Sequence, residues 1–196
     1  MKELVVATRN RGKLKEIQAL LAGVAGTVHC ADDFSGFPET IEDGATFREN
    51  ALKKAREAML FTGLPALADD SGLVVDALSG RPGVYSARFA GEGAGDAANN
   101  QRLLEELAGI PVDRRQAAFI CVLAFVTPEG DEQVFSGRIG GVILTEGRGR
   151  DGFGYDPLFQ VDGFDRTMAE LSLQEKNRVS HRGQALQSFR AFLEQG

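Results

Sequence analysis

Apolar residues along the chain follow two patterns, continuous runs and helical repeats, which alternate from the N-terminus on. The run at 4–8 predicts a short strand, and leucine and isoleucine residues at helical spacing over 14–21 predict a helix after it. The longest apolar run, 119–126, is far shorter than the roughly 20 residues that span a bilayer, so it predicts a buried strand. It lies within the first of two strands expected at about 116–127 and 132–145, which a turn joins.

Polar residues mark the ends of the predicted helices. Thr46, with Glu49 three residues later, forms a capping box and predicts a helix that runs to about Phe61. Asp96 is expected to cap a third helix, which stops at Gly109. These boundaries leave several loops between the elements.

The C-terminal helical region is expected to be interrupted. Ser172 and Glu175 form another capping box, and an amphipathic helix follows to the C-terminus. Lys176 and His181 are five residues apart and would stand about 140° apart around one straight helix, so they could not share a face. We therefore predict a break near Ser180, with Ser180 capping the terminal helix.

The middle of the chain gives the fold class. Residues 64–78 are expected to form two strand-like pieces on either side of an acidic turn, and the glycine-rich segment 79–95 a long loop of the kind that often carries function. Strands mixed with helices, with one hairpin of consecutive strands, predict an α/β protein with a mixed sheet rather than an all-parallel one. A chain of this length is expected to form a single domain over 1–196.

Composition and charge exclude several classes of protein. The net charge of -6 argues against a nucleic-acid partner, because nucleic-acid binders present a basic field. The N-terminal apolar run is too short for a signal peptide, and no run spans a membrane. Cys30 and Cys121 are too far apart for a metal-ligand pair or a disulfide framework. A cytoplasmic protein without a membrane partner is the expectation.

Charge is unevenly spread along the chain. Residues 1–16 hold five basic groups against two acidic ones, whereas residues 31–50 hold six acidic groups against Arg48 alone. A basic segment beside an acidic one suits a metal-bound anionic ligand better than a bare anion.

The sequence TRNRGK at 8–13 lies where a strand gives way to a helix. Backbone N–H groups of the first helical turn, together with Asn10 and Lys13, are placed to bind one phosphate group. A basic, solvated turn with Asn10 as the helix N-cap explains the same residues equally well. Both interpretations stay open at this point.

Two adjacent carboxylates, Asp69 and Asp70, follow an apolar run and precede Ser71 and Gly72. Adjacent like charges repel unless a cation lies beside them, which favours a metal site. Since neighbours on a strand face opposite ways, one of the pair is expected to dominate. An acidic turn capped by Asp69 is the simpler alternative. The spacing does not match the D-x-D of aspartyl-phosphate phosphatases.

Two further segments suit a nucleobase. Phe153 and Tyr155 lie beside Asp156, and His181 precedes Arg182, so an aromatic face is combined with hydrogen-bonding groups. Taken singly, Phe153 is more often a core residue and His181 more often a surface histidine with satisfied hydrogen bonds, but their combination favours the nucleobase interpretation. Glycines at 147, 149 and 152 match G-x-G-x-x-G, but no helix follows them, so a dinucleotide site is not expected.

Six motifs in order over nearly the whole chain resemble the inosine triphosphate pyrophosphatase family, in its bacterial dITP/XTP pyrophosphatase form. They are TRNRGK, TFRENALKKA, LADDSGL, RPGVYSARFAG, GFGYDPLF and EKNRVSHRGQAL. The resemblance implies an elongated mixed sheet with flanking helices and two lobes around a central cleft. It also implies a homodimeric, Mg²⁺-dependent enzyme that cleaves ITP, dITP and XTP to the monophosphate and pyrophosphate.

The resemblance also implies roles for individual residues. Asp70 would be the catalytic proton acceptor and a metal ligand, with Asp69 and Glu42 supporting the metal and Ser71 touching substrate. Lys54 would bind phosphate. The expected triphosphate loop comprises Thr8, Arg9, Asn10, Arg11, Gly12 and Lys13. The expected base-recognition group comprises Phe153, Gly154, Tyr155, Asp156, Lys176, His181 and Arg182. Arg9 departs from the family pattern, in which bacterial relatives often carry a small residue.

Base selectivity then has a physical explanation. Donors from His181, Arg182 or backbone amides would bind a 6-keto oxygen and stay unpaired against the 6-amino group of adenine, at about 1 to 3 kcal/mol for each lost bond. Two alternatives remain: a Maf-type pyrophosphatase acting on other modified nucleotides, and a nucleotide sensor without catalysis.

Overall fold

The computed structural model describes residues 1–195, which divide into two compact units. Unit 1 comprises Met1–Asp70, Cys121–Gly137 and the C-terminal part from Arg182; unit 2 comprises Ser71–Ile120 and Arg138–His181. The chain thus changes unit inside three strands and at the start of its last helix. Two units agree with the two lobes that the sequence led us to expect.

Six strands form one mixed sheet in the order β2-β1-β3-β4-β5-β6. Their bounds are β1 Glu3–Val6, β2 Thr27–Cys30, β3 Ala66–Val75, β4 Gln116–Val126, β5 Glu132–Ile143 and β6 Phe159–Val161. β1 runs parallel to both β2 and β3, whereas β6 is antiparallel to β5. The predicted α/β class with a mixed sheet is therefore confirmed, and so is the hairpin of β4 and β5.

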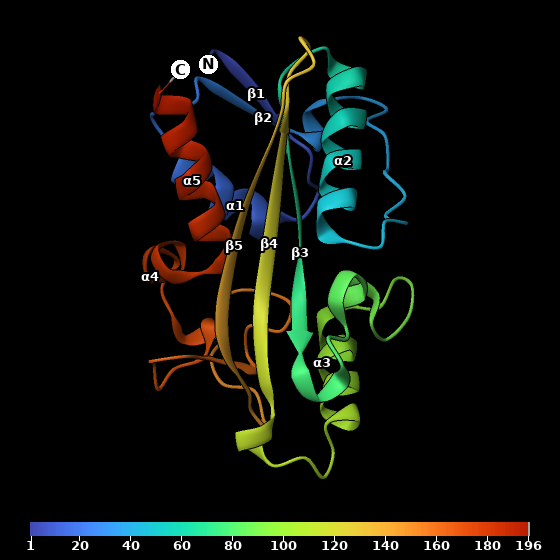
Figure 1. The fold of residues 1–196 in the computed structure, drawn as a ribbon, viewed down its shortest axis with the longest axis vertical. Helices are drawn as coiled ribbons and strands as arrows, with labels where there is room; N and C mark the ends of the chain where they lie inside the picture. The colour runs from blue at the N-terminus through green and yellow to red at the C-terminus, as the bar shows by residue number, and fades with distance from the viewer. Residues whose placement is uncertain (196) are drawn as a thin grey trace. The chain divides into compact units, whose positions relative to one another are not determined.

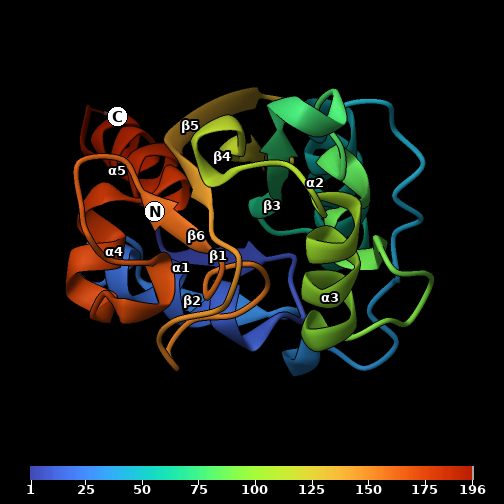
Figure 2. The ribbon, with the colours of Figure 1, turned by 90° about the horizontal axis from the view of Figure 1, so that it is seen from below.

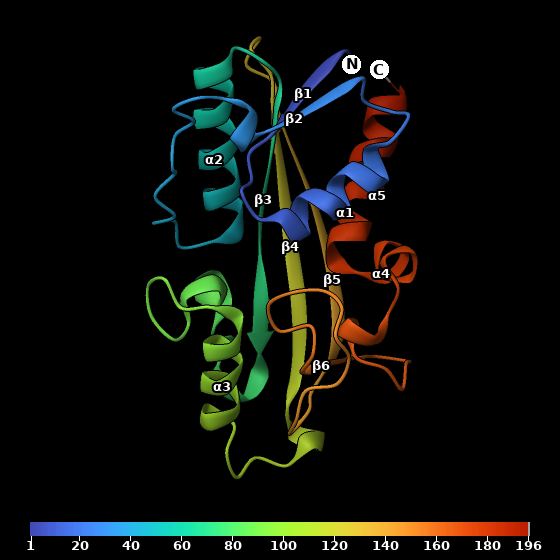
Figure 3. The ribbon, with the colours of Figure 1, turned by 180° about the vertical axis from the view of Figure 1, so that it is seen from behind.

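Unit 1 has helices on both faces of its strands. These are α1 Arg11–Leu21, α2 Phe47–Thr62 and α5 His181–Gln195. Because side chains alternate along β1, Leu4 and Val6 pack into one core with α1 and α5, whereas Val5 packs with Ala58 of α2. Figures 1 and 3 show α2 on one side of these strands and the other two helices on the opposite side.

Unit 2 contains a second, separate core. Its helices are α3 Asp96–Glu106 and α4 Leu173–Val179, which lie on opposite sides of the strands (Figure 2). Leu103 and Leu107 pack against Leu73 of β3 and Phe119 of β4. Single-turn or short 3-10 helices complete the structure: η1 Ala31–Asp33, η2 Asp76–Leu78, η3 Gly83–Arg88, η4 Val112–Arg114 and η5 Met168–Glu170.

Several predicted helix boundaries are confirmed. Thr46 and Glu49 form the expected capping box of α2, and Gly63 ends that helix in a left-handed conformation. The break after α4 is also where we expected it, since Ser180 is extended and α5 starts at His181.

Two expectations about local structure are wrong. Residues 66–75 form one continuous strand, β3, with no acidic turn, because Asp69 and Asp70 are buried and each has cationic partners. The N-cap of α3 is Gly95 rather than Asp96; Asp96 is the first helical residue, and its carboxylate binds a distant loop instead. The short strands β2 and β6 were not anticipated.

Arg115 fixes the C-terminal end of α3 in unit 2. It is buried, and its guanidinium donates to the carbonyl oxygens of Leu107 (3.0 Å), Ile110 (2.8 Å) and Leu144 (3.3 Å). Substitution of Arg115 by Met leaves these acceptors without their donor, so we expect the free energy of unfolding to fall by about 2 to 4 kcal/mol in urea titrations. Arg114→Met, at the exposed neighbouring position, is the control. Its free energy of unfolding should fall by less than about 0.5 kcal/mol.

Candidate active site

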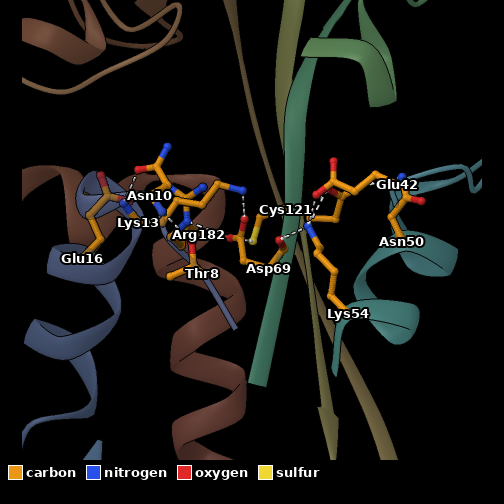
Figure 4. Close-up of polar contacts among 11 residues, drawn as sticks. Thr8, Asn10, Lys13, Glu16, Glu42, Asn50, Lys54, Asp69, Cys121 and Arg182 are labelled. Atoms are coloured by element: carbon orange, nitrogen blue, oxygen red, sulfur yellow. Dashed lines mark hydrogen bonds and ion pairs between the residues drawn. The ribbon is translucent and has the colours of Figure 1, made fainter. Parts of the chain in front are cut away.

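The centre of the candidate site is the adjacent pair Asp69 and Asp70 on β3. Both are buried, at 3% and 5% exposure, and they contact different partners because neighbouring side chains on a strand point to opposite faces. Figure 4 shows the two groups: Lys13 and Arg182 on one side of the strand, Lys54 and Glu42 on the other. All of these residues belong to unit 1.

Asp69 lies between two cations. Its carboxylate accepts hydrogen bonds from Lys13 Nζ and from Arg182 Nε (2.8 Å), and it also lies 3.2 Å from Cys121 Sγ. Burial alone would raise the pKa of Asp69, but the charges of Arg182 and Lys13 outweigh it and hold the pKa well below its ordinary value. These contacts favour the charged form of Asp69, which orients the Lys13 ammonium.

Arg182 links Asp69 to a second buried carboxylate. Its Nη1 donates to Glu16 Oε2 at 2.6 Å, and the arginine itself is only 2% exposed. Burial opposes its positive charge, yet Asp69 and Glu16 raise the pKa of Arg182 above its ordinary value. The result is a buried chain of alternating charge from α1 through α5 to β3.

Asp70 belongs to a second group around Lys54. The Lys54 ammonium lies 3.0 Å from Asp70 Oδ1 and 2.7 Å from Glu42 Oε1, and it also donates to the backbone carbonyl of Asp69 at 2.7 Å. Asn50 donates to the other oxygen of Asp70 at 3.2 Å. Burial raises the pKa of Asp70 despite Lys54, and Glu42 raises it further. Such a carboxylate is suited to accept a proton.

The residues of the predicted phosphate loop, Thr8 to Lys13, lie at the N-terminus of α1. Asn10 caps the helix by accepting from the backbone N–H of Lys13 at 3.0 Å, and Thr8 Oγ1 accepts from the N–H of Asn10 at 3.1 Å. The capping and the phosphate-binding interpretations are compatible, because a capped N-terminus still presents backbone donors and a positive dipole end. Arg9 points elsewhere, since its guanidinium donates to the carbonyl of Phe37 at 2.8 Å.

The three residues expected to hold a metal do not all lie together. Across residues 1–195 no three His, Cys, Asp or Glu side chains form a ready-made metal site. Asp70 and Glu42 share the Lys54 ammonium, whereas the Asp69 carboxylate contacts Lys13 and Arg182. One or two carboxylates completed by substrate phosphates is the usual way in which proteins hold Mg²⁺. The oxygen ligands of Asp70 and Glu42 fit that pattern.

The predicted base-recognition residues lie in unit 2, apart from Arg182. Lys176 Nζ donates to Asp156 Oδ2 at 2.5 Å and lies 4.7 Å from the centre of the Phe153 ring. The N–H of Phe153 donates to the same Asp156 oxygen at 3.0 Å. Tyr155 is buried, and its hydroxyl donates to the carbonyl of Ser86 at 2.8 Å. Phe153, Asp156 and Lys176 are thus held in one network of contacts, and Tyr155 is held separately by Ser86.

His181 and Arg182 separate at the start of α5. The His181 ring is buried and stacks on Phe119 of β4, with ring centres 4.9 Å apart and planes at 12°. It belongs to unit 2 with Ser71, whereas Arg182 belongs to unit 1 and contacts Asp69 and Glu16. The expectation that Arg182 contacts the base stays a prediction, but its described contacts are to carboxylates.

The sequence profile of the Ham1 family matches residues 4–192. This chain belongs to the Ham1 family. A dITP/XTP pyrophosphatase of Geobacter sulfurreducens is 61% identical to it, over 95% of this chain and 94% of that protein, and one of Desulfotalea psychrophila is 54% identical, over 96% and 83%. The solved structure of a HAM1 protein from Coxiella burnetii superposes with a TM-score of 0.90 at 45% identity, over the whole of both chains.

Sequence reasoning missed several residues that surround the two aspartates of this Ham1 family member. Glu16 could have been recognised from the sequence, because it lies next to Ile17 on the buried face of α1, and a buried carboxylate requires a cation as partner. Asn50 lies on the buried face of α2 and also accepts from the N–H of Gly44 at 2.8 Å. Nothing in the sequence pointed to Cys121 except its place in an apolar run.

No helix within residues 1–195 is long and apolar enough to cross a membrane.

Proposed function

We propose that this chain hydrolyses deaminated purine nucleoside triphosphates, namely ITP, dITP and XTP, to the nucleoside monophosphate and pyrophosphate. The observation that carries this proposal is the set of relatives named dITP/XTP pyrophosphatase, 61% and 54% identical over more than nine tenths of this chain. The acidic pair on β3, with a lysine on each side, supplies the groups that such a reaction requires.

In this proposal the two lysines bind the triphosphate. Lys13, held by Asp69, and Lys54, held by Asp70 and Glu42, would neutralise negative charge that grows on the phosphate oxygens in the transition state. The N-terminus of α1 adds backbone donors and its positive dipole end. Asp69 acts through Lys13 and not on the reacting atoms.

Asp70 is the proposed proton acceptor. Its two oxygens are held in fixed orientations by Asn50 and Lys54, which favours uptake of a proton from an attacking water. Asp70 and Glu42 would hold Mg²⁺ together with the substrate phosphates. When bound, Mg²⁺ supplies charge neutralisation on the phosphates and lowers the pKa of bound water.

The purine base is assigned to unit 2. Phe153 offers an aromatic face, and the linked Asp156 and Lys176 offer a charged acceptor and a donor beside it. A set of fixed donors that binds a 6-keto oxygen stays unpaired against a 6-amino group, which disfavours adenine nucleotides.

A pyrophosphate-release assay tests the proposal. Purified protein is given Mg²⁺ and, in turn, dITP, ITP, XTP, dATP, dGTP and a modified pyrimidine triphosphate, with a chelator added in a parallel series. We expect rapid release from the first three nucleotides and none with chelator. Release from the pyrimidine alone would favour a Maf-type enzyme, and tight binding of ITP without release would favour a sensor.

We also propose a cytoplasmic homodimer, for which light scattering should give roughly twice the chain mass of 21.0 kDa.

A further inference from the structure

The N-terminus of α3 contacts the loop that carries the predicted base-binding residues. The N–H of Gly154 donates to Asp96 Oδ2 at 2.6 Å, and the carbonyl of Gly154 accepts from Asn100 Nδ2 at 2.8 Å. These two backbone groups belong to the peptide bonds on either side of Gly154. Two side chains one helical turn apart therefore fix both peptide planes.

Gly154 has a left-handed backbone conformation within this loop. Its φ is +60°, in the left-handed region that few side chains adopt, so the backbone reverses between Phe153 and Tyr155. A left-handed turn held only by glycine has many accessible conformations. The bonds from Asp96 and Asn100 select one of them and so set the directions of Phe153 and Tyr155.

Helix α3 is itself firmly anchored in unit 2. The buried Asn99 accepts from the N–H of Ala90 at 2.8 Å and donates to the carbonyl of Ala87 at 3.0 Å. This ties the helix to the segment RPGVYSARFAG, for which the proposed function otherwise has no role. The carbonyl of Ser86 in the same segment accepts a hydrogen bond from the Tyr155 hydroxyl. The Phe153–Asp156 loop is therefore held at two points, Gly154 and Tyr155, by α3 and the segment bound to it.

We propose that Asp96 and Asn100 are positioning residues for base recognition, holding the Phe153–Asp156 loop in its binding conformation through the peptide groups of Gly154. This inference rests on the proposed function. It assigns the glycine-rich segment and the start of α3 a part in substrate selection, although neither residue needs to touch the nucleotide. Binding sites supported by a rigid element lose less entropy when the ligand binds.

The inference predicts a split between binding and chemistry. The loop is assigned to the base, whereas the reacting phosphates are assigned to Lys13, Lys54 and Asp70 in unit 1. Loss of either anchor should raise the KM for dITP about tenfold, since one hydrogen bond is lost, to the Asp96 carboxylate or from the neutral Asn100 amide, and the loop must be ordered by the ligand. The kcat should change less than about threefold. Preference for dITP over dATP should fall by about the same tenfold.

The experiment compares Asp96→Ala and Asn100→Ala with the wild-type chain. Asp113→Ala and Gln101→Ala are the matched controls, because both are exposed polar residues of unit 2 and Gln101 lies next to Asn100 on α3. Asp96→Asn tests rescue, since its amide oxygen still accepts from the N–H of Gly154. Steady-state kinetics with dITP and dATP are combined with amide hydrogen exchange of a peptide covering 150–158, which needs no turnover.

The inference is supported if both alanine variants show faster amide exchange at 150–158 and the tenfold rise in KM. The KM values of the controls and of Asp96→Asn should stay within about threefold of the wild-type value. Exchange and KM that match the controls would overturn the inference, as would a fall in kcat with unchanged KM, or failure of Asp96→Asn to rescue. A wild-type chain that releases no pyrophosphate from dITP, ITP or XTP would instead refute the proposed function. In that case the exchange data still decide whether Asp96 and Asn100 hold the loop.

Discussion

Substitution of Asp70 by asparagine is expected to lower the kcat for pyrophosphate release from dITP by about 10²- to 10⁴-fold, the usual contribution of a positioned general base. Asparagine keeps the shape of the side chain but cannot take a proton from water. The asparagine oxygen can accept from only one of Lys54 and Asn50, and its NH2 group then faces the other donor, so urea titrations accompany the kinetics. Retention of more than a tenth of the wild-type kcat would contradict the assignment of Asp70 as the proton acceptor.

Glu42→Gln is the matched comparison, because it removes the other carboxylate that contacts Lys54. If Glu42 serves only the metal, its loss should raise the Mg²⁺ concentration for half-maximal activity about tenfold or more, with a kcat near the wild-type value at saturating Mg²⁺. Magnesium titrations of both variants separate the two roles. Equal loss of kcat in both variants at saturating Mg²⁺ would argue that the carboxylates act as one unit.

Most of the fold was predictable from the sequence because its elements are locally marked. The capping boxes at Thr46 and Ser172 give the starts of α2 and α4, and the long apolar run gives β4. By contrast, β2 and β6 are too short to show a period of their own, and they are strands only because β1 and β5 supply their partners.

The errors share a physical cause, which is long-range pairing of polar groups. Two adjacent aspartates in an apolar run look like a turn until the cations that neutralise them are known, and those cations lie on α1, α2 and α5. Asp96 similarly resembles an N-cap, yet its carboxylate binds Gly154, 58 residues further along the chain. Local propensity cannot foresee such partners.

The candidate site was predictable as a set of residues and only partly as a geometry. The sequence predicted that Asp69 and Asp70 face opposite ways, and the structure gives them separate sets of partners. It did not predict that Asp69 would be neutralised by Lys13 and Arg182, whereas Asp70 and Glu42 share Lys54. Only the folded chain shows which cation each carboxylate contacts.

Arg182 provides the second prediction with a large expected effect. Substitution of Arg182 by methionine removes the guanidinium that the buried carboxylates of Glu16 and Asp69 both accept from. Removing one partner of a buried ion pair typically costs about 3 to 5 kcal/mol, because the remaining charge stays desolvated. We therefore expect the free energy of unfolding, measured in urea, to fall by about that amount.

A double-mutant cycle distinguishes this structural role from the base contact that the family resemblance implies. Glu16→Gln removes one of the two desolvated charges, so Arg182→Met should cost at least about 1 kcal/mol less in that background than in the wild-type chain. A direct base contact predicts the reverse pattern: an Arg182→Met protein with near wild-type stability, additive effects with Glu16→Gln, and a raised KM for dITP. Urea titrations of the four proteins, with dITP kinetics on those that fold, decide between the two roles, because a buried arginine held by two carboxylates contributes to folding before any nucleotide binds.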